Sequence, residues 1–565
     1  MKSQKKQNII QLLLALSIIL LINYIASQSF FRLDLTADKR YTLSGVTHEL
    51  LDSLDDMVYI EVYLEGDMPM GFQRMKKSVR EMLDEFRVIA GENIQYSFVN
   101  PSQSSDQEKR NAFYRDLYER GLEPTNVKER DEEGGMAEKI LFPGAIITYG
   151  DKETPVTFLK NNPAFSAEVN LNNSIQDLEY ELVDAIRKIT TGKQKKIAFI
   201  EGQDELDEFE TGDITRALAA YYAIDRVTIK EYLTILDPYD AVIIAGPREK
   251  YSEKSKFILD QYIMNGGKVL WFIDAVSVNK DSLSTGSSTF ALINDANLND
   301  QLFKYGVRVN PNVIQDVQCA VIPVNTAVTG RQPKFVPAPW LYYPLLIPPD
   351  NHSITKSLNL IKTEFPSVLD TVGIGNQVSK KILLSSSANA RVLDAPLLVN
   401  LAQVREQISP VAFKKANLPI AVLMQGTFES VFKNRYLENI IGSSNFSFKE
   451  TSEPTEMIVV SDADIIRNEV RERADGVFIS PLGYDRYTKQ TYGNKEFVMN
   501  AVHYLVDQQG LLELRSREFK LRILDKARII EERLKWQLIN TLLPVLFILL
   551  MGGILIYSRK RKYSV

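Results

Sequence analysis

The sequence predicts an α/β protein in which a small α/β domain and a larger parallel-sheet α/β domain are flanked by two transmembrane helices. Apolar runs at both ends and alternating strand and helix patterns between them indicate this arrangement. The chain has 565 residues, of which 45% are hydrophobic and 25% charged, as is ordinary for globular proteins. A chain of this length is expected to hold more than one domain.

The apolar runs cover residues 9–27 and 538–557, and each has a basic flank, in residues 1–8 and 558–565. About 20 apolar residues cross a bilayer as a helix, and basic flanks prefer the cytoplasmic side. We therefore expect both tails in the cytoplasm and the main body on the opposite side. Four basic residues between positions 526 and 535 make the charge contrast at the second run less clean.

Each apolar run has an alternative interpretation. Residues 9–27 could be a cleaved signal peptide, although they exceed the usual apolar length of about 7–15 residues. Residues 538–557 could be a buried core helix, but Pro544, Gly552 and Gly553 would weaken a soluble helix and are tolerated in membranes. We favour two membrane anchors.

Residues 45–192 show the order βαβαββα, with Ser44 as the expected N-cap of the first helix. This order is typical of a thioredoxin-like or similar small α/β domain. Cys319 is the only cysteine, so the redox pair of thioredoxins is absent and only the architecture could be shared. Strands are expected at 57–64, 94–99, 139–149 and 153–159, and helices at 46–54, 72–89, 106–121 and 174–191.

Residues 193–510 predict a second α/β domain. Its apolar strands are separated by helices, which indicates a parallel sheet covered on both faces. An insertion at 276–349 interrupts the pattern, and a charged juxtamembrane helix at 511–537 leads into the second apolar run. Strands are expected at 196–200, 240–245, 268–273, 382–385, 420–424 and 457–460, and helices at 213–222, 252–265, 297–305 and 496–506.

Catalytic chemistry is not indicated. No phosphate-binding loop of the type G-x-x-x-x-G-K-[ST] occurs. The second domain resembles a class I amidotransferase-like fold, but Asp274 stands where such enzymes carry a cysteine. Cys319 lies in the insertion, and His503 is interpreted as a surface histidine of a helix. We predict no catalysis, no cofactor and no metal, and the net charge of −5 indicates no nucleic-acid surface.

Polar residues follow several predicted strands, where parallel sheets usually bind ligands. A ligand or partner cleft is one interpretation, and helix capping and loop solvation by small acids is the one we favour. The candidate cleft residues are Glu201, Gly202, Asp204, Asp274, Ser461 and Asp462.

Residues 333–349 are rich in proline and unusually apolar for a loop. Exposed aromatic residues often mark interfaces, but the segment could equally be a lid folded onto the sheet. The candidate interface residues are Trp340, Tyr342, Tyr343, Leu345 and Leu346.

Four segments in order resemble one family: FRLDLTADKRYTLS, IAFIEGQ, YDAVIIAGPREKYSEKSKFILDQYIMNGGKVLWFID and GNKEFVMNAVHYLVDQQGLLELRSREFKLRILD. The chain resembles the gliding-motility ABC-transporter accessory family (GldG-like) of Bacteroidetes, within a wider group of ABC-transporter auxiliary domains. The resemblance implies a non-catalytic subunit of the bacterial inner membrane with a periplasmic body. It also implies two partners, a multi-span permease (GldF-like) and a cytoplasmic ATPase (GldA-like), and supplies no catalytic residues.

Two other function classes stay open. The first is a periplasmic solute- or peptide-binding module that uses the strand-end cleft. The second is a hydrolase or amidotransferase-like enzyme that would depend on Cys319 and His503.

Overall fold

A computed structural model describes residues 10–18, 21, 43–130, 136–160, 166–190, 195–230, 232–325, 335–373, 377–405, 411–436, 446–473, 476–506 and 526–563. The chain divides into two units, one made of Tyr41–Arg517 and the other of Met1–Arg40 together with Glu518–Val565.

The small α/β region is built on a four-stranded sheet in the order β2-β1-β5-β6. Strand β1 runs parallel to β2 and antiparallel to β5. Helix α3 packs its apolar stripe, which includes Met75, Val79 and Leu83, into the core of this sheet. The elements are α2 (Gly45–Asp52), β1 (Val58–Val62), α3 (Met70–Ala90), β2 (Ile94–Phe98), α4 (Gln107–Glu119), β3 (Thr125–Arg130), β4 (Met136–Leu141), β5 (Gly144–Tyr149), β6 (Lys152–Thr157), α5 (Ala167–Gln176) and α6 (Leu178–Thr190).

The expected order of elements is present in this region, with three differences. The strand expected at 139–149 is two strands, because the chain turns tightly at Pro143, where the Gly144 N–H donates to the Phe142 carbonyl at 2.8 Å. Strand β3, which the sequence reading missed, pairs with β4 as a hairpin. The helix expected at 174–191 is two helices, α5 and α6, and α5 begins earlier. Ser44 caps α2 as expected, since it accepts the Thr47 N–H at 3.0 Å.

The larger α/β region is built on a seven-stranded sheet in the order β19-β22-β23-β10-β9-β7-β8. The five strands from β23 to β8 are parallel, and β22 is antiparallel to both of its neighbours. The edge strand β8, whose residues are mostly half-buried, is not among the strands predicted from the sequence. The strands are β7 (Lys196–Glu201), β8 (Ala223–Thr228), β9 (Ala241–Ala245), β10 (Lys268–Phe272), β19 (Val378–Ser385), β22 (Pro419–Gly426) and β23 (Thr455–Val460).

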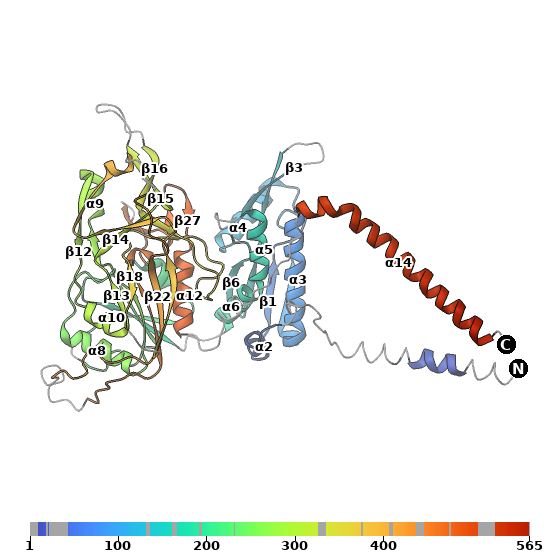
Figure 1. Cartoon of the computed structure of the whole chain (residues 1–565), viewed down its shortest axis with the longest axis horizontal. Helices are drawn as coiled ribbons and strands as arrows, with labels where there is room; N and C mark the ends of the chain where they lie inside the picture. Colours follow the sequence, from blue (N-terminus) through green and yellow to red (C-terminus); the bar gives the residue numbers. More distant parts are fainter. Residues whose placement is uncertain are drawn as a thin grey trace. The chain divides into compact units, whose positions relative to one another are not determined.

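Helices cover both faces of this sheet, as the apolar strands predict. On one face, Phe199 and Ile243 pack in a core with α7 (Gly212–Leu218) and α12 (Asn494–Val506). On the other face, Ile200 and Ile244 pack with α8 (Glu253–Met264) and α10 (Asn299–Tyr305) (Figure 1).

The insertion and the segments after it are rich in short strands. The proline-rich segment, expected as a loop, is the 12-residue strand β16, which pairs with β15 and β17. Its residues alternate between buried and less buried positions from Trp340 onward, and this alternation favours a strand despite the prolines. The elements are β11 (Val276–Val278), α9 (Lys280–Gly286), β12 (Ser288–Ile293), β13 (Val307–Val309), β14 (Asn312–Asp316), β15 (Cys319–Asn325), β16 (Phe335–Leu346), β17 (Ile361–Lys362), β18 (Leu369–Thr371), β20 (Ala390–Asp394), β21 (Leu397–Asn400), β24 (Val470–Arg473), β25 (Gly476–Ile479), β26 (Tyr484–Asp485) and β27 (Gln490–Thr491).

The C-terminal helix α14 covers Lys526–Tyr563 without interruption, so the charged residues from 526 and the apolar run belong to one helix (Figure 1). Within the described part of the chain, Glu532–Arg561 is the one helix long and apolar enough to cross a membrane, whereas two were expected. Of the first expected span, residues 10–18 are helical and most of the remainder lies outside the described residues. Residues 511–525 of the expected juxtamembrane helix also lie outside them.

Candidate functional site at the carboxyl edge of the central sheet

The carboxyl ends of the parallel strands carry the polar residues that the sequence singles out. Glu201 ends β7, Asp274 follows β10, and Ser461 follows β23. Strand β10 is parallel to β9 and β23, and β9 is parallel to β7, so these ends meet at one edge of the sheet. This is the edge at which ligands bind in open α/β sheets.

Asp274 and Asp462 use their carboxylates to fix neighbouring backbone. Asp274 Oδ1 accepts the Ala463 N–H at 2.7 Å. Asp462 accepts the N–H of Asp464 through Oδ1 and that of Glu364 through Oδ2, both at 2.8 Å. The first of the Asp462 bonds caps a short 3₁₀ helix, which is the capping role considered for these acids.

Two further contacts keep this edge closely packed. The Ser461 hydroxyl donates to the carbonyl of Ser367 at 2.6 Å. Gly246, which follows β9, has a φ of +64°, and a Cβ there would lie 2.7 Å from the Ala463 Cβ. Only glycine fits this position, because both the backbone conformation and the space exclude a side chain.

The other three predicted residues lie at the end of β7 and in the loop that follows it. Glu201 pairs with Arg226 at 2.6 Å. Gly202 has a φ of +115°, which favours glycine. Asp204 is exposed and lies 3.7 Å from Arg248.

A continuous series of ion pairs, the edge ion chain, connects this loop with the residues after β23. Apart from the closer Lys280–Glu364 pair, successive charged atoms lie between 2.6 and 3.8 Å apart. Its members alternate in charge along the whole series. In order they are Asp204, Arg248, Glu210, Arg467, Asp464, Lys280, Glu364 and Lys362.

Two acids beside the edge ion chain hold protons more tightly than usual. Burial, with the Asp464 charge as the second cause, raises the pKa of Asp274 to about 6. Burial, followed by the charges of Asp464 and Asp274, raises the pKa of Asp462 well above its ordinary value. Close carboxylates of this kind disfavour full ionisation of the group.

Glu364 behaves in the opposite way. Burial by itself would raise its pKa, but the cations of Lys280 and Lys362 outweigh burial and hold the pKa well below the ordinary value. The same attraction to Asp464 and Glu364 overcomes burial at Lys280 and raises the pKa of that ammonium. These groups therefore stay charged at neutral pH and neutralise one another.

Most members of the edge ion chain are not among the residues predicted from the sequence. Asp464 and Arg467 stand three residues apart directly after β23, a spacing that could have suggested a pair. No such signal marks Lys280, because its partner Asp464 is 184 positions away in the chain. Lys280 is the first residue of α9, between β11 and β12, and its pair with Asp464 joins the insertion to the loop after β23. Glu364, which follows β17, pairs with Lys280 in turn.

The five candidate interface residues of β16 are buried or half-buried within the protein. Trp340, Tyr342 and Leu346 are buried, and Tyr343 and Leu345 are half-buried. The Tyr342 ring lies 5.3 Å from that of Phe365, and Lys362 Nζ lies 5.4 Å from the ring of Tyr343. The most exposed apolar side chains of this strand are instead Phe335 and Val336.

The two residues of the enzyme alternative have unreactive surroundings. Burial, with the nearby Asp316, raises the pKa of Cys319 to about 11, so its thiol stays protonated at neutral pH. His503 was expected on the surface, but it is buried, because the side of α12 that carries it faces Tyr222. The Tyr222 hydroxyl lies 2.7 Å from His503 Nδ1.

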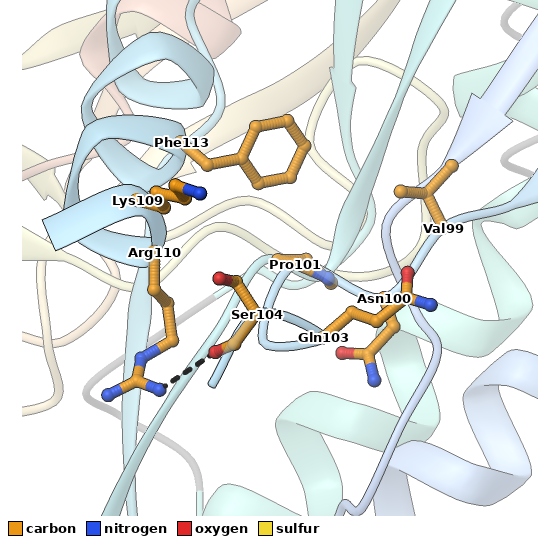
Figure 2. A pocket seen from close by; sticks show the side chains of 8 residues that line it. All are labelled: Val99, Asn100, Pro101, Gln103, Ser104, Lys109, Arg110 and Phe113. Carbon is orange, nitrogen blue, oxygen red and sulfur yellow. Dashed lines mark hydrogen bonds between the residues drawn. The ribbon is translucent and has the colours of Figure 1, made fainter. Parts of the chain in front are cut away.

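A surface cavity of about 350 Å³ in the small region was not expected from the sequence (Figure 2). It lies between the loop after β2 and the first turns of α4, and Arg110 donates to the Ser104 carbonyl at 3.1 Å. No sequence motif accompanies it. The lining residues are Val99, Asn100, Pro101, Gln103, Ser104, Lys109, Arg110 and Phe113.

Comparison with known protein families assigns the chain to one of them. Residues 194–501, more than half of the chain, match the auxiliary family described as ABC-type uncharacterized transport system. The chain belongs to this family. It is thus an auxiliary component of an ABC-type transport system, and the C-terminal apolar helix suggests a membrane anchor. Residues 37–148 match a family described as a domain of unknown function.

Individual relatives of this auxiliary component are distant. An uncharacterized protein of Borreliella burgdorferi is 21% identical over 461 residues, which cover 79% of this chain and 83% of that protein. The mmIFT52 N-terminal domain is 14% identical and aligns with 55% of this chain and 98% of its own, at a TM-score of 0.30. A putative ThuA-like protein from Parabacteroides merdae is 9% identical, with 56% and 91% covered, at a TM-score of 0.25. At such TM-scores the solved structures support no functional argument.

Proposed function

We propose that this chain is a non-catalytic, membrane-anchored periplasmic subunit that couples an ABC transporter to events outside the inner membrane. The partners in this proposal are a multi-span permease and a cytoplasmic ATPase, and the process is gliding motility, which is supported by the resemblance of the sequence to gliding-motility accessory proteins. The main observation behind this proposal is that residues 194–501 match the auxiliary family, in a chain that also has a helix long and apolar enough to cross a membrane.

The absence of catalysis in this proposal is supported by the state of the candidate groups. The acids at the carboxyl edge either cap backbone or belong to the edge ion chain. Cys319 is protonated at neutral pH, and His503 is buried against Tyr222. A nucleophile needs an activating base within hydrogen-bond reach, and these groups lack the required character.

Helix α14 supports a mechanical role in this proposal. Its 38 residues extend over about 57 Å at 1.5 Å per residue, whereas the hydrocarbon core of a bilayer is about 30 Å thick. Trp536 and Tyr557 lie near the two ends of the apolar run, where aromatic residues favour the membrane interfaces. The charged turns before Trp536 therefore continue beyond the membrane as part of the same helix, and the proposal is that movement of permease helices is transmitted along it.

Co-purification tests the partners. The full-length chain is isolated from gently solubilised membranes and the accompanying chains are identified. We expect a multi-span permease and an ATPase, and their absence from a stable, correctly inserted preparation would reject the proposal. Proteolysis of intact spheroplasts tests the orientation: the body should be degraded, and its survival would place it in the cytoplasm.

A Gly-Ser insertion after Gln537 tests the mechanical role. It interrupts α14 between its charged turns and its apolar run, so we expect loss of transporter-dependent gliding with normal folding and membrane insertion. The same insertion between Gly150 and Asp151, in the turn that joins β5 to β6, is the control. Unchanged gliding in the α14 variant would show that helical continuity is not needed.

A further inference from the structure

A stripe of three polar residues and one proline lies at the start of the apolar run of α14. Gln537, Asn540, Thr541 and Pro544 follow one another at intervals of three and four residues. At 3.6 residues per turn, all four lie within about 60° of Gln537 around the helix axis. Leu542 and Leu546 lie on the opposite side, where the helix is apolar throughout.

Two groups in this stripe have unmet hydrogen-bonding capacity. Pro544 has no N–H, so the carbonyl of Asn540, four residues earlier, loses its helical donor. The Asn540 side-chain amide is exposed, and the described residues give it no hydrogen-bond partner. Thr541 differs, since its hydroxyl donates to the Gln537 carbonyl at 2.7 Å.

A polar group without a hydrogen-bond partner is energetically unfavourable inside a membrane. In lipid, each polar group needs a partner from protein or water, and asparagine and threonine in spanning helices hydrogen-bond across to neighbouring helices. A stripe that includes proline and small or polar residues faces protein, while an all-leucine face is suited to lipid.

We infer that this stripe is the face by which α14 docks against a membrane helix of the transporter's multi-span component. That partner helix must carry donor and acceptor side chains at the depth of Asn540, to serve its carbonyl and its amide. The inference rests on the proposed function, because a chain of this auxiliary family with one described span must act on transport through another membrane-spanning chain.

Asn540→Leu tests this face in the full-length protein. The substitution removes the amide while keeping a similar side-chain volume, so we expect the yield of the co-purified multi-span component to fall about tenfold. Leu542→Ile, at similar depth on the opposite side, is the matched control and should leave the yield unchanged. Pro544→Ala returns a donor to the Asn540 carbonyl and should give a smaller loss. Protein level, membrane insertion and protease resistance of the body are measured for each variant.

The outcomes separate this inference from the proposed function. If the unsubstituted chain captures no multi-span component, the proposed function fails, and this inference fails with it. If a complex forms and Asn540→Leu leaves it intact, water at the membrane surface serves this turn and the inference alone is overturned.

The same preparation also tests two other segments that could bind this face of α14, namely a second copy of this chain and residues 9–27 of the same chain. In a Cys319→Ser background, Thr541→Cys, which lies on the same face and keeps the Asn540 amide, should form a disulfide to a cysteine introduced into the partner helix of the multi-span component. A disulfide to a second copy of this chain, or to a cysteine placed in residues 9–27 of the same chain, would assign the face elsewhere and overturn the inference.

Discussion

The two edges of the central sheet differ in how they use charge. At the carboxyl edge, eight charges of alternating sign form one series of ion pairs, in which Lys280 joins the insertion to Asp464. The pKa values of Asp274 and Asp462 beside this series are raised. At the amino edge, Lys195 and Lys268 donate to the carbonyls of Val506 and Leu505 at the end of α12, the second at 2.5 Å. A cavity of about 370 Å³ with polar lining adjoins these lysines.

This difference shows how a sheet built like a ligand-binding one can serve another purpose. The edge at which such sheets bind ligands is occupied by the protein's own charges, so its polar residues hold structure. The opposite edge stabilises the negative end of the helix dipole of α12, after which the chain continues toward α14. Three substitutions can break or sharpen this contrast.

The largest effect is expected for Glu364→Ala at the carboxyl edge. The substitution leaves the Lys280 and Lys362 ammonium groups without their shared carboxylate, and breaking a largely buried pair costs about 3 kcal/mol. Urea unfolding of the full-length protein in detergent, followed by tryptophan fluorescence, measures it. Glu453→Ala removes an exposed partner of Lys449 and should cost less than about 0.5 kcal/mol. Equal effects would show that the edge ion chain is no more than a surface network.

A smaller effect of opposite sign is expected for Asp274→Asn. Asp274 has an ordinary pKa of 3.8 and a pKa of about 6 in the folded protein, so the folded state binds its proton more tightly than the unfolded state. Its contribution to stability is therefore greatest below about pH 4 and is lost as the pH rises toward 6. Asparagine can still accept the Ala463 N–H, so we expect a gain of about 2 kcal/mol at pH 7.5 and almost none at pH 4. If the substitution lowers stability at both pH values, the surroundings of Asp274 do not favour its uncharged form, and the prediction is wrong.

The smallest effect is expected for Lys268→Met at the amino edge. Burial already lowers the pKa of this ammonium, which offsets part of what its hydrogen bond contributes. Loss of the bond to the Leu505 carbonyl should cost about 1 kcal/mol and increase hydrogen exchange mainly in the last turn of α12. Lys254→Met on α8 is the control. A loss as large as that from Glu364→Ala would remove the contrast between the edges.

Much of the architecture follows from local pattern. Apolar strands such as β9 and β10, buried on both faces, can be recognised from their runs of aliphatic residues, and the N-cap at Ser44 from its hydroxyl before a helix. Strand β8 was missed because an edge strand, with half-buried residues, lacks that continuous apolar run. Strand β16 was missed because its three internal prolines argue against a strand unless the pairing partner is known.

The candidate site could be predicted only in part. Strand ends bring Asp274, Ser461 and Asp462 to one edge, and parallel topology alone requires this. The pairing of Lys280 with Asp464 depends on how the insertion folds back, which no local pattern records. Likewise, the burial of His503 depends on which side of α12 meets Tyr222.

The capping of α12 by Lys195 and Lys268 has a consequence for how tension would spread. These lysines lie at the starts of β7 and β10, which flank β9 in the middle of the sheet. A pull on the chain beyond Val506 would thus act, through these two hydrogen bonds, on strands in the middle of the sheet.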